Sequence, residues 1–287
     1  MGHVGDEITP FLKARRAALD PAALGLPDGV TRRRVRGLRR EEVAQLAGIS
    51  IDYYTRIEQG RARSISDEVL GAVARALRMT PTEHAYLRNI TQARRRTAHA
   101  TCPAGPSPRP RVRPQILQLL DTFGDTVPAV VHGPGTDILA WSRAAARLSF
   151  DFDALPEAQL NSAYLIFLRA EAKTLFPDWE EIAEDSVAAL RAEMGRTPDA
   201  PRVRQVVCEL SAASEEFRRW WEACEVQDHS HGTKRIHNPQ VGELVLNYEA
   251  FPIADGGGQR LCTYTASKGS VSELRLQALT EREGASV

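Results

Sequence analysis

The stretch RREEVAQLAGISIDYYTRIEQG, residues 39–60, predicts two short helices joined by a tight turn. Gly48 can adopt the positive φ that such a turn requires. Ser50 is a suitable N-cap for the second helix, and Asp52 places negative charge in its first turn. We therefore expect one helix to end at Gly48 and the next to begin directly after Ser50.

The two helices are expected to pack through apolar side chains at helical spacing, namely Val43, Ala44, Ala47, Tyr54 and Ile57. Ala44 is small at the position where the two helix axes would cross. This spacing matches a helix-turn-helix, whose second helix lies in the major groove of DNA. The alternative is an ordinary helical hairpin in an all-α core.

Three amphipathic segments flank this motif, at residues 7–19, 66–77 and 80–90. Ser66 is a candidate N-cap for the second of them. Thr80 and Glu83 have capping-box spacing at the start of the third, with Pro81 at its first helical position. Residues 1–93 are therefore predicted to form an all-α domain of five helices, with the helix-turn-helix in second and third place.

The formal net charge is zero, but the charges are divided unevenly along the chain. Residues 1–113 hold 21 Lys+Arg and 11 Asp+Glu, and residues 114–287 hold the remaining 16 and 26. A basic half beside a helix-turn-helix favours binding to nucleic acid. A solvated basic surface without a partner is the alternative.

Arginines concentrate before and after the motif, where phosphates would neutralise them. Those in the loop that precedes the motif could also enter a narrow minor groove, and Arg40 near the start of its first helix could reach a phosphate. The candidates for DNA contact in this group are Arg32, Arg33, Arg34, Arg36, Arg39, Arg40, Arg61 and Arg63. The alternative for any single one of them is a solubilising surface position.

A linker rich in proline and arginine is predicted at residues 94–114. Beyond it, residues 115–287 mix helices and strands. A helix at residues 115–123 precedes two strands, at 129–132 and 137–141, and a helical block occupies residues 162–224. Three further strands follow at 232–237, 242–248 and 260–266. This order predicts an α+β domain of PAS-like arrangement.

The wording of the first domain, in FLKARR, GLRREEVAQLAGIS and DYYTRIEQGRAR, resembles actinobacterial Xre-family regulators, whose DNA-binding domain is lambda-repressor-like. The second domain, in ILAWSRAA, FPDWEE, HGTKRIHNPQVGELVLNYE and TYTA, is similar to the MmyB-like ligand-binding domain that some of them carry. The resemblance implies a DNA-binding transcriptional regulator. One departure is Arg40-Glu41, where many phage-type repressors have a glutamine, so no base contact is assumed there.

The resemblance also implies site residues. The groove-facing residues of the recognition helix would be Ser50, Ile51, Asp52, Tyr53, Thr55 and Arg56. Arg56 could pair with guanine or with phosphate, and Ile51 and Tyr53 could touch thymine methyl groups. The second domain would bind a small apolar ligand, such as a fatty acid.

Aromatic side chains could line a ligand pocket in the second domain, or could simply fill its core. The candidates are Trp141, Phe167, Phe176, Trp179, Phe217, Trp220, Tyr248 and Tyr264. Polar residues that could hold a carboxylate head group at such a pocket are Arg218, His231 and Lys234.

Enzyme chemistry finds little support in the sequence, which has no GxSxG, P-loop, GxGxxG or HExxH pattern. His229, His231 and His237, with Cys224 nearby, are a minor candidate for a metal site. The four cysteines show no CxxC spacing, so neither a zinc knuckle nor a disulfide framework is predicted. We therefore expect a protein that is not an enzyme and needs no cofactor.

The sequence also gives an expectation of compartment and partners. No apolar run approaches the length of a membrane helix, and no signal peptide is indicated, so a cytoplasmic, nucleoid-associated protein without a membrane partner is expected. The predicted partners are double-stranded DNA with a palindromic operator, a small apolar ligand and a second copy of the chain. In the alternative, the second domain is a protein-interaction module without a ligand.

Overall fold

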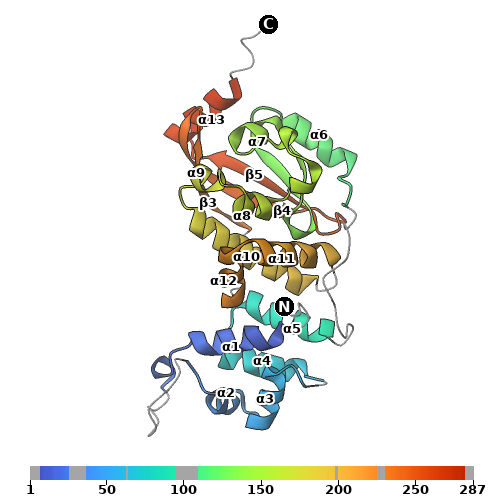
Figure 1. The fold of residues 1–287 in the computed structure, drawn as a ribbon, viewed down its shortest axis with the longest axis vertical. Helices are drawn as coiled ribbons and strands as arrows, with labels where there is room; N and C mark the ends of the chain where they lie inside the picture. The colour runs from blue at the N-terminus through green and yellow to red at the C-terminus, as the bar shows by residue number, and fades with distance from the viewer. Residues whose placement is uncertain are drawn as a thin grey trace. The chain divides into compact units, whose positions relative to one another are not determined.

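The computed structural model of the chain describes residues 7–25, 37–62, 64–94, 109–197, 200–224, 226 and 230–281 (Figure 1). Its internal contacts divide the chain into two compact units. The first unit comprises residues 1–104, 191–200 and 219–228, and the second comprises residues 105–190, 201–218 and 229–287.

The first unit is helical, as predicted. Its N-terminal part contains α1 (Ile8–Ala18), a 3-10 turn η1 (Ala22–Leu24), α2 (Arg40–Ala47), α3 (Ile51–Glu58), α4 (Asp67–Ala76) and α5 (Pro81–Arg94). These five α-helices confirm the predicted order, with the helix-turn-helix formed by α2 and α3.

Side-chain caps explain where α4 and α5 begin. The Ser66 hydroxyl accepts a hydrogen bond from the backbone N–H of Val69 at 3.3 Å. At the start of α5, the Glu83 carboxylate accepts from the N–H of Thr80 at 2.7 Å. In return the Thr80 hydroxyl accepts from the N–H of Glu83 at 3.2 Å. Each cap pairs backbone donors that a helix start otherwise leaves without partners.

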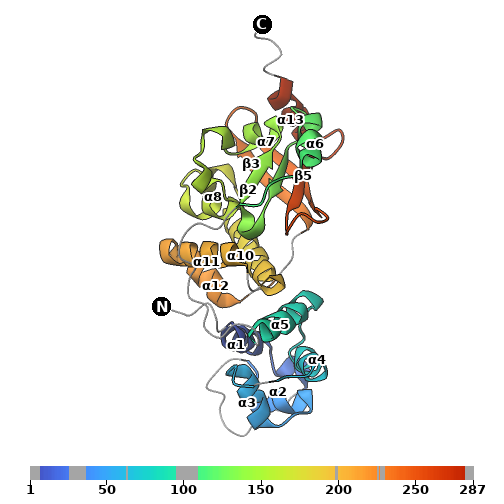
Figure 2. The same ribbon diagram turned by 90° about the vertical axis from the view of Figure 1, so that its right-hand side faces the viewer.

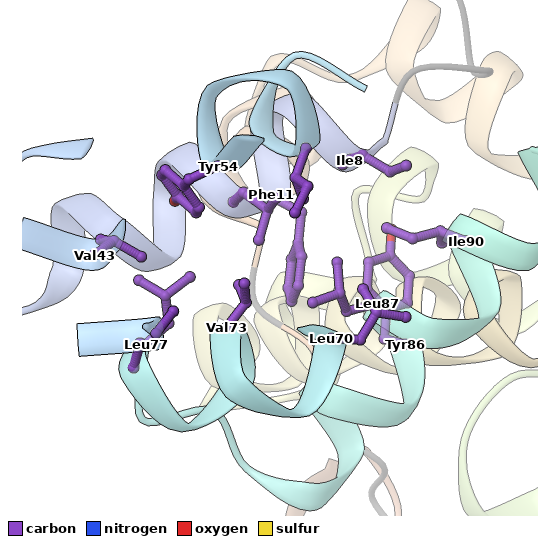
Figure 3. Close-up of a cluster of buried hydrophobic side chains, with 14 of the residues drawn as sticks. Ile8, Phe11, Val43, Tyr54, Leu70, Val73, Leu77, Tyr86, Leu87 and Ile90 are labelled. Carbon is purple, nitrogen blue, oxygen red and sulfur yellow. The ribbon is translucent and has the colours of Figure 1, made fainter. Parts of the chain in front are cut away.

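One apolar core joins these helices (Figure 3). Phe11 of α1 and Tyr86 of α5 meet edge to face, with ring centroids 4.9 Å apart. Val43 of α2, Tyr54 of α3 and Leu70 of α4 are buried in the same cluster. Burying large apolar side chains stabilises such a unit by roughly 1.5–3 kcal/mol for each of them.

The first unit also buries a guanidinium, that of Arg191. Its Nη1 donates to the Glu7 carboxylate at 2.5 Å and to the Tyr86 hydroxyl at 3.2 Å. Its Nη2 donates to the backbone carbonyl of Trp221, and the guanidinium lies 4.0 Å from the centre of the Trp221 ring. The buried charge of Arg191 is therefore paired with a carboxylate, that of Glu7.

The second unit is built from α6 (Pro114–Phe123), β1 (Ala129–His132), η2 (Pro134–Thr136), β2 (Ile138–Trp141) and α7 (Arg143–Leu148). A helical block follows, with η3 (Phe152–Ala154), η4 (Glu157–Gln159), α8 (Ser162–Leu168), α9 (Ala172–Leu175), α10 (Trp179–Arg196), α11 (Pro201–Ala213) and α12 (Glu215–Ala223). The chain then forms β3 (His231–Asn238), β4 (Gly242–Pro252), β5 (Arg260–Ala266) and α13 (Val271–Glu281). The ends of α10 and α12 belong to the first unit.

The five strands form one antiparallel sheet in the order β2-β1-β5-β4-β3. The two early strands join the three late ones where β1 pairs with β5, with Val130 opposite Cys262. Helices lie beside this sheet in the turned view (Figure 2). The predicted α+β arrangement is confirmed, and the structure adds α13, which the sequence analysis did not predict.

Side chains alternate between the two faces of this sheet, as strand geometry requires. Ala129 and Val131 of β1 and Leu261 of β5 pack with Leu120 of α6 on one face. Val130 and His132 point to the opposite face, where a cavity lies. Strand alternation therefore separates a packed layer from the layer that contains the cavity.

Two further expectations can be compared with the described residues. None of the helices that the structure describes is long and apolar enough to cross a bilayer. Cys224 and Cys262 are free and buried, whereas Cys208 takes part in a disulfide, although the spacing of the cysteines predicted no disulfide framework. The fourth cysteine, Cys102, lies outside the described residues.

Candidate nucleic-acid interface and ligand cavity

The turn between α2 and α3 sets the direction of the second helix. Gly48 closes α2 with φ of 66°, and its N–H bonds to the carbonyls of Ala44 and Gln45. Ser50 then caps α3 by accepting a hydrogen bond from the N–H of Tyr53 at 3.2 Å. The structure thus places both turn residues in the geometry predicted for them.

Helix α3 has one buried face and one exposed face. Tyr54, Ile57 and Glu58 point inward, while Ile51 exposes 52% of its surface and Arg56 is exposed. An apolar side chain left in water at the start of a helix, with a cation one turn further on, suits contact with base edges and phosphates.

A hollow of about 670 Å³ adjoins this exposed face. It is lined by Asp52, Tyr53, Thr55, Arg56, Gln59, Arg61, Ala62 and Ser64. The Tyr53 hydroxyl donates to the carbonyl of Ser64 at 3.3 Å, which ties α3 to the segment that follows it. Four of the predicted groove-facing residues therefore share one surface with Arg61.

The arginines of this region fall into two groups by their partners. The side chain of Arg56 makes no hydrogen bond or ion pair with another described residue. Arg40, although 42% exposed, donates from Nε to the Glu58 carboxylate at 2.8 Å. Arg39 pairs with Glu41 at 3.3 Å on the surface. Arg40 therefore already neutralises an internal carboxylate, which its selection as a phosphate contact did not anticipate.

Some predicted DNA contacts cannot be placed. Arg32, Arg33, Arg34, Arg36 and Arg63 lie outside the described residues. Their proposed contacts with phosphate stay predictions.

Glu58 is a residue whose role the sequence did not reveal. Its side chain is 0% exposed and accepts hydrogen bonds from Arg16 Nε at 2.9 Å and from Arg40 Nε at 2.8 Å. Burial alone would raise the pKa of this carboxyl group, but the bonds from the two guanidinium groups outweigh it and lower the pKa. Glu58 therefore ties α1, α2 and α3 together.

The second unit contains a partly open cavity of about 80 Å³. Most of its lining is apolar, from Val130, Ile138, Ala145, Leu148, Phe150, Phe152, Leu165, Ile166, Phe176, Ile182 and Ile236. Its polar lining comes from His132, Ser149, Ser162, Lys234 and Tyr264. A mainly apolar wall with a few polar groups is typical of small-molecule sites.

The two basic groups of the cavity are desolvated. Burial, together with the charges of Lys234 and Arg260, lowers the pKa of His132 to about 4, and its Nε2 lies 2.9 Å from the Ser162 hydroxyl oxygen. Burial likewise lowers the pKa of Lys234. The Nζ atom of Lys234 lies 4.8 Å from the centre of the Tyr248 ring.

Three of the predicted ligand-binding residues line this cavity, namely Phe176, Lys234 and Tyr264. Tyr248 lies beside it, with its ring 6.4 Å from that of Tyr264. The helical pattern alone could not have separated these residues from the core aromatics, because the sheet brings them together from β3, β4, β5 and the α9–α10 segment.

The remaining predicted ligand residues lie elsewhere. Phe167, Trp179 and Phe217 form a packed aromatic cluster, and Trp141 packs against Phe152. Trp220 is half-buried with Arg219 5.0 Å from its ring. His231 and Arg218 are exposed, and Arg218 bonds to the carbonyl of Ser211. The alternative, that these aromatics fill the core, describes the cluster better than a ligand role does.

His132 and Ser162 were absent from the predicted set. His132 sits two residues after the buried Val130 on a strand, so alternation could have placed it on the inner face. Ser162 offers no comparable signal, because it reaches the cavity only through the packing of α8.

The histidines considered for a metal site do not gather. His231 and His237 are exposed on β3, Cys224 is buried, and His229 lies outside the described residues. Among the residues that the structure describes, no group of three or more His, Cys, Asp or Glu side chains could hold a metal ion.

Comparison with known families agrees with this geometry. A model of a helix-turn-helix domain matches residues 11–87. The model of the MmyB-like transcription regulator ligand binding domain matches residues 112–279, which is more than half of the chain. A search of curated proteins finds no match. The chain therefore belongs to the MmyB-like transcription regulators, with a DNA-binding helix-turn-helix domain followed by a ligand-binding domain.

Proposed function

We propose that this regulator recognises a specific operator through the exposed face of α3, and that a small molecule in the cavity of the second unit controls this binding. Operator recognition by α3 is supported mainly by the absence, in the part of the chain that the structure describes, of an internal partner for its exposed arginine. Arg56 is exposed without an ion partner among the described residues, beside the exposed Ile51. Arg56 would pair with guanine, and Ile51 and Tyr53 would contact thymine methyl groups.

Arginines around α3 would supply the sequence-independent part of the affinity. Arg61 lines the same hollow as Arg56, and Arg39 is exposed at the start of α2. The arginines at residues 32–36 and 63 are proposed to add phosphate contacts. Each phosphate that they neutralise makes binding more dependent on salt.

A palindromic operator bound by a homodimer follows from the size of the reading element. Helix α3 has 8 residues, and one such helix reads few base pairs. Two half-sites multiply specificity. We place the protein in the cytoplasm because its proposed operator lies on the chromosome.

The cavity limits the ligand. About 80 Å³ holds roughly three water molecules, or an organic molecule of a few heavy atoms. Phe150 and Phe176, whose ring centroids lie 6.3 Å apart, both line this cavity, and a longer chain such as a fatty acid would need more room than it offers. We therefore propose a small, mainly apolar molecule with one polar end, which would face Lys234, His132 and Ser162.

The second candidate function is a protein-interaction module without a ligand. It requires the cavity to stay empty, and the polar groups in the cavity wall argue against that. Replacing Ala145 with leucine would fill the cavity from α7. An interaction module would keep its DNA response after this change, and a ligand-controlled regulator would lose it.

The experiment that tests the proposed function has two arms. A selection of bound duplexes from a random pool should yield a palindromic consensus with the wild type. The same operator is then titrated with a panel of small molecules of up to about six heavy atoms, a size that follows from the cavity volume. Specific binding that no consensus describes would contradict the first half, and an operator affinity unmoved by the whole panel would contradict the second.

A further inference from the structure

Lys234 occupies the inner face of a sheet. Along β3 the odd-numbered residues from His231 to His237 are exposed, whereas Lys234 and Ile236 turn inward and line the cavity. Lys234 lies opposite Leu246 of β4, which is fully buried. Because strand alternation fixes these faces, the amine cannot reach solvent by a change of register without turning Ile236 outward as well.

This amine has no counter-charge in contact with it. None of the residues that line the cavity is acidic. Within the described part of the chain, no hydrogen bond or ion pair joins Lys234 Nζ to a carboxylate, and Cys262 and, more weakly, Asp185 act on it only through space. The chain has only three other lysines, Lys13, Lys173 and Lys268, and all of them are exposed.

Lysine differs chemically from the arginines that dominate this chain. A guanidinium stays charged in any protein environment, whereas an amine can lose its proton when it is buried. Desolvation lowers the pKa of Lys234, so more of it is the neutral amine at neutral pH. The neutral amine is the form that attacks carbonyl carbon.

Groups that can move protons stand around the same cavity. With its pKa lowered to about 4, His132 is neutral at neutral pH and can accept a proton. Ser162 and Tyr264 add two hydroxyl groups to the cavity wall. Addition of an amine to a carbonyl group needs such transfers between nitrogen and oxygen.

We propose that Lys234 forms a reversible imine with a small neutral aldehyde or ketone that enters the cavity. This inference rests on the proposed function and names the chemical class of its ligand. In the first step, the Nζ lone pair forms a bond to the carbonyl carbon and the C=O π pair moves to oxygen. A proton passes from nitrogen to that oxygen and gives a carbinolamine.

In the second step, the C–O bond breaks and the oxygen leaves as water, taking up one proton. The nitrogen gives up its remaining proton, and the C=N bond forms. The step releases one water molecule and needs no oxidant or reductant. Hydrolysis by returning water reverses it, so the site could report the concentration of the carbonyl compound.

A carbonyl compound suits the cavity better than a carboxylate does. A carboxylate must bring its charge into an apolar space and draw a proton onto Lys234, and burying both charges costs free energy that only their pairing offsets. A neutral carbonyl compound enters without that cost. A three-carbon or four-carbon member also fits the small volume.

The test uses the full chain, propanal and sodium cyanoborohydride at neutral pH, followed by peptide mapping. The reductant converts an imine into a stable propyl amine, and the map separates the four lysines and the α-amino group. We expect Lys234 to be labelled several-fold faster than Lys13, Lys173 or Lys268, because burial lowers the pKa of Lys234 and so raises its neutral fraction. Equal rates at all four lysines would overturn the proposal.

Two variants and one competitor complete the test. Lys234→Met removes the amine at similar length and should abolish the fast labelling. The matched control, Lys173→Met, should leave labelling of Lys234 unchanged. Propionate in place of propanal distinguishes the carboxylate alternative. Thermal stabilisation by propionate that depends on Lys234, with no fast adduct from propanal, would reject the imine. Failure of the proposed function is a separate result: Lys234 is labelled quickly, but operator affinity does not change.

Discussion

Among the ionisable side chains that this regulator turns toward its interior, Glu58 of the first unit and Lys234 of the second unit are treated differently. In the first unit, the Glu58 carboxylate receives one hydrogen bond from each of two guanidinium groups. In the second unit, the Lys234 amine faces a mainly apolar cavity, and its Nζ atom lies 4.8 Å from the centre of the Tyr248 ring. Glu58 is fully buried and Lys234 is half-buried, and only Glu58 has its charge neutralised by ion pairs with other described residues.

This difference in pairing indicates that Glu58 has a structural role, whereas Lys234 is available to a ligand. A buried charge with its full set of partners fixes the elements that supply them, here α1, α2 and α3. A desolvated basic group without a counter-ion costs stability, so it is expected where a ligand completes the site. The same distinction applies within the first unit, where Arg40 has a carboxylate partner and Arg56 has none among the described residues.

The largest expected effect is that of Glu58→Gln. It leaves Arg16 and Arg40 without their carboxylate, and loss of one partner of a buried ion pair typically costs about 3–5 kcal/mol. Because both guanidinium groups keep partial access to water, we expect about 3 kcal/mol. Thermal and urea unfolding of the full chain, followed by circular dichroism, would measure this loss.

Glu41→Gln is the matched control, because Glu41 pairs with Arg39 on the surface and is 57% exposed. Its effect should stay within about 0.5 kcal/mol. A Glu58→Gln variant as stable as the Glu41→Gln variant would contradict the structural role of Glu58.

The second effect concerns pH. The pKa of His132 is lowered in the folded state to about 4, so between its ordinary value near 6.5 and about 4 only the unfolded chain binds the proton. Stability therefore falls as pH falls through this window, by at most on the order of 3 kcal/mol for this group. Urea unfolding of wild type and His132→Gln at about pH 7 and about pH 4.5 isolates this contribution. The wild type should lose more stability than the variant, and an equal loss would show that His132 is protonated freely in the folded protein.

The third effect tests the two arginines of the first unit against each other. Arg56→Ala should reduce discrimination between operator and random duplex by about 2 kcal/mol, with little change in stability. Arg40→Ala should destabilise the fold, because it removes one partner of Glu58, with a smaller change in discrimination. Fluorescence anisotropy with both duplexes, beside thermal unfolding, separates the two outcomes. If Arg56→Ala left the discrimination between operator and random duplex unchanged, the exposed face of α3 would not be the surface that reads the operator.

Local signals in the sequence were sufficient for the elements of the fold. Gly48, Ser50 and the Thr80–Glu83 pair act within a few residues of themselves, so the turn and the helix starts could be read directly. The strands were recognisable because alternation repeats every two residues. The ion pairs of Glu58 were not, since Arg16 lies 42 residues away and no local pattern joins them.

The cavity shows the same limit more sharply. Its lining comes from elements between β1 and β5, so only the packed sheet and helices reveal which side chains share it. Lys234 was predicted as a ligand residue because of its charge, and the structure shows that its side chain points inward and lines the cavity. His231, selected from the same strand, points to the outer face and is exposed. Both residues were predicted to hold a polar head group of the ligand, and the alternation of side chains along β3 distinguishes them.

The smallest expected effect is that of Lys234→Met, which should raise the free energy of unfolding, whereas Glu58→Gln lowers it. Folding lowers the pKa of Lys234, so below its ordinary value near 10.5 the unfolded chain holds the proton more strongly and the amine opposes folding. Lys234→Met removes this penalty and should raise the free energy of unfolding at about pH 7 by on the order of 1 kcal/mol. The gain should shrink as pH rises toward about 10.5 and disappear above it, because the wild-type amine is then neutral in both states. Urea unfolding of both proteins across this range measures it, with Lys173→Met as control because Lys173 pairs with Glu216 on the surface at 3.4 Å. A loss of stability in Lys234→Met that persists at high pH would mean that the amine has a structural partner after all, and the contrast with Glu58 would disappear.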